Sequence, residues 1–372
     1  MSVREIFLTA LRLGFVTFGG PTAHLAWYQT TYVETKKWLT QDEFARIVSL
    51  AQILPGPTSS QAGFGIGLKL AGLKGAFAAW VGFTLPGFLL MVVAAAGLSP
   101  LINNPRVIQS LKLVVVVIVA HAVTSMALSL IPNLLALAWA STIALVVVFT
   151  DSRLGFLLVL FSGIWYARKH LREIRNLKIQ TSQSLISLSF LLLLVTSFLI
   201  GGDWLFFGIM LQAGLLVIGG GHVVLPILES GVVGNGLLSI SEFLSGYGIV
   251  NLMPGPLFNF AAYLGYLNPS PINGVIGALI ATILIFVPGI LMMLWLTPKW
   301  ESLATGNFKL FITGANIAVV GLLAASWWDP ILIAVDLTFI KVIVAAIGFI
   351  LMRRIPLTAA IILTLTASLL VS

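Results

Sequence analysis

Two Pro-Gly-Pro segments, Pro55-Gly56-Pro57 and Pro254-Gly255-Pro256, each interrupt a long apolar run of the sequence. Proline lacks a backbone N–H and clashes with the preceding helical turn, so each segment predicts a break in a helix. In hydrocarbon a peptide group without a hydrogen bond is costly, so broken backbone is expected only where protein or a polar cavity surrounds it. The two breaks therefore indicate a binding site inside the protein.

Two glycine-rich segments, Gly19-Gly20-Pro21-Thr22 and Gly219-Gly220-Gly221-His222, complete this pattern. A helix N-terminus carries free N–H groups and a partial positive charge, and both attract anions. Glycine lets an oxyanion approach the backbone closely. Close packing of helices is the alternative explanation for the glycines. Their recurrence in both halves of the chain favours an anion site made of helix ends.

Several side chains near these breaks could add charge or hydrogen bonds. Arg12 precedes Gly19 by two helical turns and could supply a fixed positive charge, or it could reach the membrane interface instead. His24 and His222 follow the glycines and could bind the anion or carry a proton, or each could bond a neighbouring helix. The expected substrate-binding residues are Gly19, Gly20, Thr22, His24, Pro55, Gly56, Pro57, Thr58, Ser59, Gly219, Gly220, Gly221, His222, Pro254, Gly255, Pro256, Asn259 and Arg12.

Acidic side chains avoid the interior of the apolar runs, and Glu229, Glu242 and Asp336 come nearest to being exceptions. A carboxylate relay for cations is therefore poorly supported, and an anionic substrate suits the distribution better. The chain has no cysteine, which excludes thiol chemistry. The sequence contains no convincing metal cluster, catalytic triad or P-loop, so we expect no enzyme activity, no catalytic residue, no metal and no cofactor.

The composition predicts the class of protein. Of 372 residues, 59% are hydrophobic and only 9% are charged, which excludes an ordinary soluble domain. We expect an all-α polytopic membrane protein with discontinuous helices and about 13 transmembrane spans. The expected spans are residues 4–30, 42–66, 74–98, 106–130, 132–150, 153–168, 184–200, 204–229, 242–266, 272–297, 309–328, 331–351 and 355–371.

The net charge of +8 is explained by basic residues in the predicted loops, so no nucleic-acid partner is expected. With a cytoplasmic N-terminus, the inner loops hold more Lys and Arg than the outer loops, and the basic segment from Arg168 to Arg175 lies inside. Because basic residues favour cytoplasmic loops, we expect the N-terminus in the cytoplasm and the C-terminus outside.

Three landmarks recur along the chain at a nearly constant offset. Phe18-Gly19-Gly20 matches Ile218-Gly219-Gly220, Pro55-Gly56-Pro57 matches Pro254-Gly255-Pro256, and Leu85-Pro86-Gly87 matches Val287-Pro288-Gly289. We expect a first repeat at 1–178, a connecting span at 179–203 and a second repeat at 204–372. Six spans plus one connector reverse the orientation of the second copy, so the two repeats are expected to be inverted.

The motifs that suggest a family are Phe18-Gly19-Gly20-Pro21 with His24, Gln52-Ile53-Leu54-Pro55-Gly56-Pro57, Gly219-Gly220-Gly221-His222 with Pro226, and Asn251-Leu252-Met253-Pro254-Gly255-Pro256 continuing through Asn259 to Tyr263, Gly265 and Tyr266. In this order they resemble the chromate ion transporter (CHR) family over essentially the whole chain. The resemblance implies a two-repeat carrier of oxyanions in the inner membrane, which typically exports chromate and has sulfate as a close isostere.

We therefore expect a secondary active transporter that exports chromate across the plasma membrane by alternating access, with a coupling proton on His24 or His222 as a further expectation. A carrier that takes up sulfate or another oxyanion, or a passive anion channel, is the alternative. The expected partners are chromate or sulfate, the proton and the lipid bilayer, and a homodimer is left open.

Overall fold

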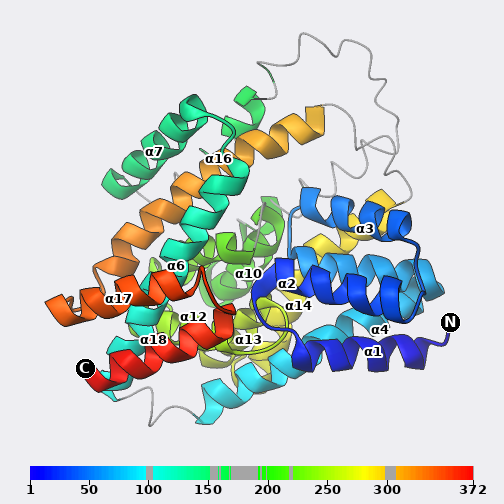
Figure 1. The fold of residues 1–372 in the computed structure, drawn as a ribbon, viewed down its shortest axis with the longest axis horizontal. Helices are drawn as coiled ribbons and strands as arrows, with labels where there is room; N and C mark the ends of the chain where they lie inside the picture. The colour runs from blue at the N-terminus through cyan, green and yellow to red at the C-terminus, as the bar shows by residue number, and fades with distance from the viewer. Residues whose placement is uncertain are drawn as a thin grey trace.

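The computed structural model describes residues 1–97, 104–150, 199–217, 221–297 and 307–371, together with 158, 161–166, 168, 192 and 195–197. Every element in this part of the chain is helical (Figure 1), which confirms the all-α fold. Four described helical segments are long and apolar enough to cross a membrane, at Thr58–Gly97, Pro105–Leu130, Gly274–Leu296 and Thr313–Leu332. The first of them consists of two helices that meet at Ala71 and Gly72, where the backbone is non-helical. The chain is a polytopic membrane protein. The count of thirteen spans stays a prediction, because the runs expected near 153–168 and 184–200 fall largely outside the described residues.

The first repeat begins with two predicted spans, and each consists of two helical pieces. Its elements are α1 (Val3–Val16), α2 (Gly20–Tyr28), the π-helix η1 (Gln29–Thr35), α3 (Gln41–Ile53), α4 (Thr58–Gly97), α6 (Pro105–Leu130) and α7 (Leu134–Phe149). Side-chain caps set several starts: the hydroxyl of Ser2 accepts from the Glu5 N–H, and Thr40 forms a capping box with Glu43. The breaks fall at the glycine pair and at Pro-Gly-Pro, where the sequence predicted them.

The second repeat follows the same plan. Its elements are η3 (Gly202–Trp204), α10 (Leu205–Leu216), η4 (Gly221–Val223), α11 (Val224–Leu228), the π-helix η5 (Glu229–Val233), α12 (Ile240–Leu252), η6 (Leu257–Asn259), α13 (Phe260–Leu267), α14 (Gly274–Leu296), α16 (Asn307–Ser326), η8 (Trp327–Leu332), α17 (Phe339–Leu351) and α18 (Leu357–Val371). In Figure 1, α1, α2 and α3 lie on one side of the central helices α10, α12, α13 and α14, while α6, α7, α16, α17 and α18 lie on the other. The later part of α4, in cyan, runs below the central helices.

Details outside the predicted landmarks also recur in both repeats. Each repeat has a π-helix after its second helical piece, starting at Gln29 and at Glu229. Ser239 and Glu242 form a capping box at the position that corresponds to Thr40 and Glu43. These correspondences fit two copies of one structural unit.

Glycines also provide the tight helix crossings of each repeat. A Cβ on Gly14 of α1 would lie 2.7 Å from the carbonyl oxygen of Phe83 in α4. A Cβ on Gly214 of α10 would collide with the carbonyl oxygen of Ile285 in α14. Glycine therefore has two roles in this fold: it allows helices to pack closely, and it occurs at the helix breaks.

One boundary near the C-terminus differs from the prediction. A span was expected at 331–351, but α17 begins only at Phe339. The preceding helix is already interrupted at Asp329, where the backbone is non-helical, so Ile331 and Leu332 belong to a short turn between the two helices. Thr338 caps α17 through its hydroxyl oxygen, which accepts a hydrogen bond from the Lys341 N–H. The apolar pattern alone does not reveal this turn, because Ile331, Leu332 and Ile333 continue the hydrophobic run.

Candidate functional site

The helix breaks of the two repeats bond to each other in reciprocal pairs. The Gly255 N–H donates to the carbonyl oxygen of Thr17, the residue that ends α1, at 3.0 Å. The Gly56 N–H donates to the carbonyl oxygen of Val217, the residue that ends α10, at 2.7 Å. Each Pro-Gly-Pro segment of one repeat is thus hydrogen-bonded to the first break of the other repeat. Backbone groups freed by the breaks are satisfied inside the protein, as a membrane interior requires.

Positive φ angles make glycine necessary at these breaks. Gly56 has a φ of +117° and Gly255 a φ of +89°, while Gly19 and Gly20 have φ values of +94° and +80°. Residues with a Cβ adopt such angles only at a cost, so glycine lets the chain turn where the helix stops.

A second reciprocal contact joins the half-helices that follow the Pro-Gly-Pro segments. The Gln61 amide nitrogen donates to the carbonyl oxygens of Pro55 at 2.7 Å and of Gly289 in α14 at 3.3 Å. The Asn259 amide nitrogen donates to the carbonyl oxygen of Thr84 in α4 at 3.2 Å. A Cβ on Gly87 would collide with the Asn259 amide, and one on Gly289 would lie 2.9 Å from the Gln61 amide nitrogen. The third landmark of the repeat, Pro-Gly, therefore makes room for an amide of the other repeat.

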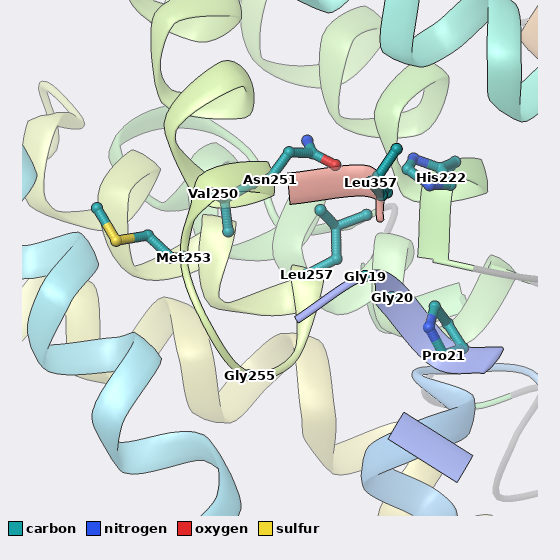
Figure 2. A pocket seen from close by; sticks show the side chains of 10 residues that line it. All are labelled: Gly19, Gly20, Pro21, His222, Val250, Asn251, Met253, Gly255, Leu257 and Leu357. Carbon is teal, nitrogen blue, oxygen red and sulfur yellow. The ribbon is translucent and has the colours of Figure 1, made fainter. Parts of the chain in front are cut away.

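A small, partly open cleft lies at the pair formed by Thr17 and Gly255, and it takes in the N-terminus of α2. Its lining residues are Gly19, Gly20, Pro21, His222, Val250, Asn251, Met253, Gly255, Leu257 and Leu357. Figure 2 shows Pro21 and His222 on one side, Val250 and Met253 on the other, and Leu257 between them. Gly20 opens α2 and Leu257 opens η6, so one helix start from each repeat borders the cleft. The N–H groups of a first helical turn have no partner within the helix and are free to donate to an anion.

His222 is the ionisable side chain of the cleft. It is half-buried, and its Nδ1 lies 2.7 Å from the hydroxyl oxygen of Tyr247 in α12. Asn251 lies one turn further along α12, and its amide nitrogen donates to the Tyr247 carbonyl oxygen at 2.7 Å. The cleft therefore combines backbone of the first repeat with polar side chains of the second. None of the described residues that line it carries a carboxylate.

Four of the predicted binding residues line the cleft: Gly19, Gly20, His222 and Gly255. Pro55, Gly56, Pro57 and Ser59 are buried around the other reciprocal pair, and Thr58 beside them is half-buried. Pro254, Pro256 and Gly221 are buried next to lining residues. Gly219 and Gly220 lie outside the described residues.

The remaining predicted residues lie away from the cleft lining. Arg12 and Thr22 are exposed, on α1 and α2 respectively. His24 is buried, and its ring packs edge-on against Phe83 with a centroid distance of 5.3 Å. Asn259 faces α4 through the hydrogen bond to Thr84.

Sequence reasoning missed Tyr247 and did not assign a binding role to Asn251 or Leu357. Tyr247 and Asn251 are four residues apart on the helix that leads into the second Pro-Gly-Pro, a spacing that places them on one face. That spacing makes them neighbours on α12, but the role of Tyr247 appears only from its contact with His222 in the fold. Leu357 comes from the C-terminal end of the chain, and nothing local in the sequence connects it with the breaks.

Comparison with known proteins identifies the family. The sequence profile of the family described as Chromate transporter matches residues 4–167 and 204–371, one copy for each repeat. The chain belongs to this family. A match in two copies fits the inverted-repeat interpretation, and membership places the chain among membrane-embedded ion transporters.

Curated relatives cover most of the chain. It is 28% identical to an uncharacterised transporter of Methanocaldococcus jannaschii, over 87% of this chain and 83% of the relative. It is 27% identical to a chromate transport protein of Pseudomonas aeruginosa, over 88% and 81% respectively, and 27% identical to a probable chromate transport protein of Synechococcus elongatus, over 87% and 84%. No solved structure matches the chain.

Proposed function

We propose that the protein is a secondary active transporter that carries chromate, a tetrahedral dianion, out of the cell by alternating access. The observation that supports this most directly is the cleft, where the N-terminus of α2 from one repeat lies with the start of η6 and His222 from the other. The names of the relatives from Pseudomonas aeruginosa and Synechococcus elongatus give chromate as the substrate to test first.

The expected strength of binding suits a carrier. A helix N-terminus contributes about 0.3–2 kcal/mol toward a negative charge, depending on burial. Two helix starts and one neutral donor can therefore hold a dianion without trapping it. Among the lining residues that the structure describes, no carboxylate would repel the anion.

The reciprocal pairs suggest how access alternates. The pair between Thr17 and Gly255 borders the cleft, whereas Gly56, in the equivalent pair with Val217, is buried. In an inverted-repeat carrier the two repeats exchange conformations, so the opposite state would close around Gly255 and open around Gly56. Such an exchange needs a two-state element, which the two equivalent hydrogen-bonded breaks could supply.

His222 is the candidate for a coupling proton, because it is the titratable residue that lines the cleft and an ordinary histidine titrates near neutral pH. His24 is a second candidate. His24 packs against Phe83 and does not line the cleft, so a proton on His24 would be further from the substrate than a proton on His222.

Transport in everted membrane vesicles tests the proposal. Vesicles containing the protein should accumulate chromate with saturable kinetics, and an imposed pH gradient should change the rate. Competition by sulfate at similar concentrations would extend the substrate range to both dianions, since they share shape and charge. Flux that does not saturate with chromate would contradict a carrier and indicate a passive channel. Saturable flux that ignores the pH gradient would remove the proton from the mechanism.

A further inference from the structure

Tyr247 lies directly behind His222 without lining the cleft. Its side chain is fully buried in α12, and its hydroxyl oxygen is 2.7 Å from Nδ1 of His222, whose ring borders the cleft. The two ring centroids are 6.4 Å apart with a steep interplanar angle of 68°. The contact is therefore made edge-on through the hydroxyl group, and stacking does not explain it.

We infer that Tyr247 is a positioning residue that fixes the tautomer and orientation of His222 for oxyanion binding. This inference rests on the proposed transport function. A tyrosine hydroxyl can donate to Nδ1 of a neutral imidazole, and the ring proton then sits on Nε2. An oxyanion needs donors, so the Nε2–H tautomer lets a neutral His222 donate to a substrate oxygen. A histidine without this partner divides its population between two tautomers and several ring orientations.

The surroundings of Tyr247 hold its ring in one place. Phe260 packs against the ring with a centroid distance of 5.7 Å, and Phe243 packs on Phe260 at 5.1 Å. The amide nitrogen of Asn251, a cleft residue, donates to the Tyr247 carbonyl oxygen at 2.7 Å. That bond fixes the backbone of α12, and the Tyr247 ring itself is held by packing, so it can orient its neighbour with little further loss of entropy.

The first repeat has no equivalent arrangement. At the offsets of 200 and 199 that relate the nearest landmarks, His222 corresponds to Thr22, Tyr247 to Val48 and Asn251 to Gln52. A valine has no hydroxyl to donate. The first repeat therefore offers backbone N–H groups to the anion, and the second repeat offers the oriented side-chain donor.

Substitution of one hydroxyl group tests the inference, and the chain provides a matched control. Tyr247→Phe removes the donor to His222 and keeps the ring. Tyr263→Phe is the control: Tyr263 is also fully buried, its ring stacks on the same Phe260 at 6.3 Å, and its hydroxyl has no hydrogen-bond partner among the described residues. We expect Tyr247→Phe to raise the KM for chromate about tenfold with little change in kcat, because one hydrogen bond to the anion is weakened. Tyr263→Phe should leave both constants within about twofold of wild type.

A double-mutant cycle with His222→Asn shows whether Tyr247 acts through His222. Once His222 is replaced, adding Tyr247→Phe should raise KM no further. Nitrogen-15 NMR of the histidine-labelled wild-type protein gives a readout that does not depend on transport activity. His222, assigned by its loss in His222→Asn, should show an unprotonated Nδ1 and a protonated Nε2.

Two results would overturn the inference while leaving the proposed function intact. The first is that the wild-type protein transports chromate and that Tyr247→Phe and Tyr263→Phe have the same KM and kcat. The second is a proton on Nδ1 of His222. Additive effects in the cycle would also contradict it, by assigning Tyr247 a role independent of His222. Absence of saturable chromate transport by the wild-type protein would overturn the proposed function, and this inference with it.

Discussion

At the scale of single residues, glycine has two separable roles in this protein. Gly255 needs its freedom in φ at +89°, yet a Cβ there would meet neighbours only at ordinary contact distances of 3.5–3.6 Å. Its requirement is conformational rather than steric. Gly236, in the turn before α12, has a φ of +68°, and no atom in the described part of the chain lies within 4 Å of an added Cβ.

This comparison gives a prediction for Gly255→Ala and Gly236→Ala. Each should cost about 1–2 kcal/mol of stability, because alanine resists a positive φ. Gly255→Ala should in addition reduce chromate transport several-fold, since Gly255 donates its N–H to Thr17 beside the cleft. Thermal unfolding in detergent and initial transport rates in vesicles measure the two effects. Equal transport by both variants would mean that the Gly255 break is purely structural.

The residues that break helices were predictable from the sequence, and their partners were not. Proline and glycine act on the backbone locally, so Pro254-Gly255-Pro256 identifies a break without knowledge of the fold. The acceptor of the Gly255 N–H is Thr17, more than two hundred residues away. Tyr247 was missed for the same reason, because its role appears only when His222 is placed beside it.

At the scale of elements, the Pro-Gly sites in α4 and α14 are contact points for the other repeat. Gly87 lies where the Asn259 amide and the Pro254 carbonyl oxygen approach α4, so an added Cβ would collide with the first and lie 2.8 Å from the second. In the sequence these Pro-Gly pairs serve only as landmarks of the repeat. The structure shows that the glycine after each proline also decides how closely the half-helices approach.

We predict that Gly87→Ala destabilises the protein by about 1–3 kcal/mol, the usual cost of forcing extra volume into a packed interface. Gly97→Ala in the same helix is the control, because no atom of the described residues lies within 4 Å of its added Cβ. It should be neutral or slightly stabilising, since alanine favours a helix over glycine. The difference in unfolding midpoint between the two variants is the measurement. If Gly87→Ala is as stable as Gly97→Ala, the two repeats are not closely packed where Gly87 meets Asn259.

At the scale of the whole molecule, the repeat pattern was readable from three landmarks, while the exact number of spans was not. The landmarks are local sequence features, and their offsets survive small insertions. Boundaries such as the one at Phe339 depend on a cap and a turn inside an apolar run, which hydrophobicity does not mark. Leu357, from the last helix, lines the cleft together with Gly19, Gly20 and Gly255. The sequence does not show this contact, because it forms only in the assembled fold.

The orientation predicted from charge can be tested directly, because the chain contains no cysteine. One cysteine at Ser2 and, in a second variant, one appended to the C-terminus would be the only thiols present. In intact cells a membrane-impermeant maleimide should label the C-terminal cysteine and reach position 2 only after permeabilisation, because basic loops are retained in the cytoplasm. Labelling of both sites from the same side would require an even number of spans and a revised connector.

The central claim is that interrupted helices of the two repeats jointly hold an oxyanion in the cleft between Gly19, Gly20 and His222. The most direct measurement is a crystal structure grown with chromate, with an anomalous difference map collected at the chromium absorption edge. We predict one strong peak within hydrogen-bonding distance of the backbone at the start of α2 and facing Nε2 of His222. A peak confined to the outer surface, or no peak at chromate concentrations that saturate transport, would contradict the account.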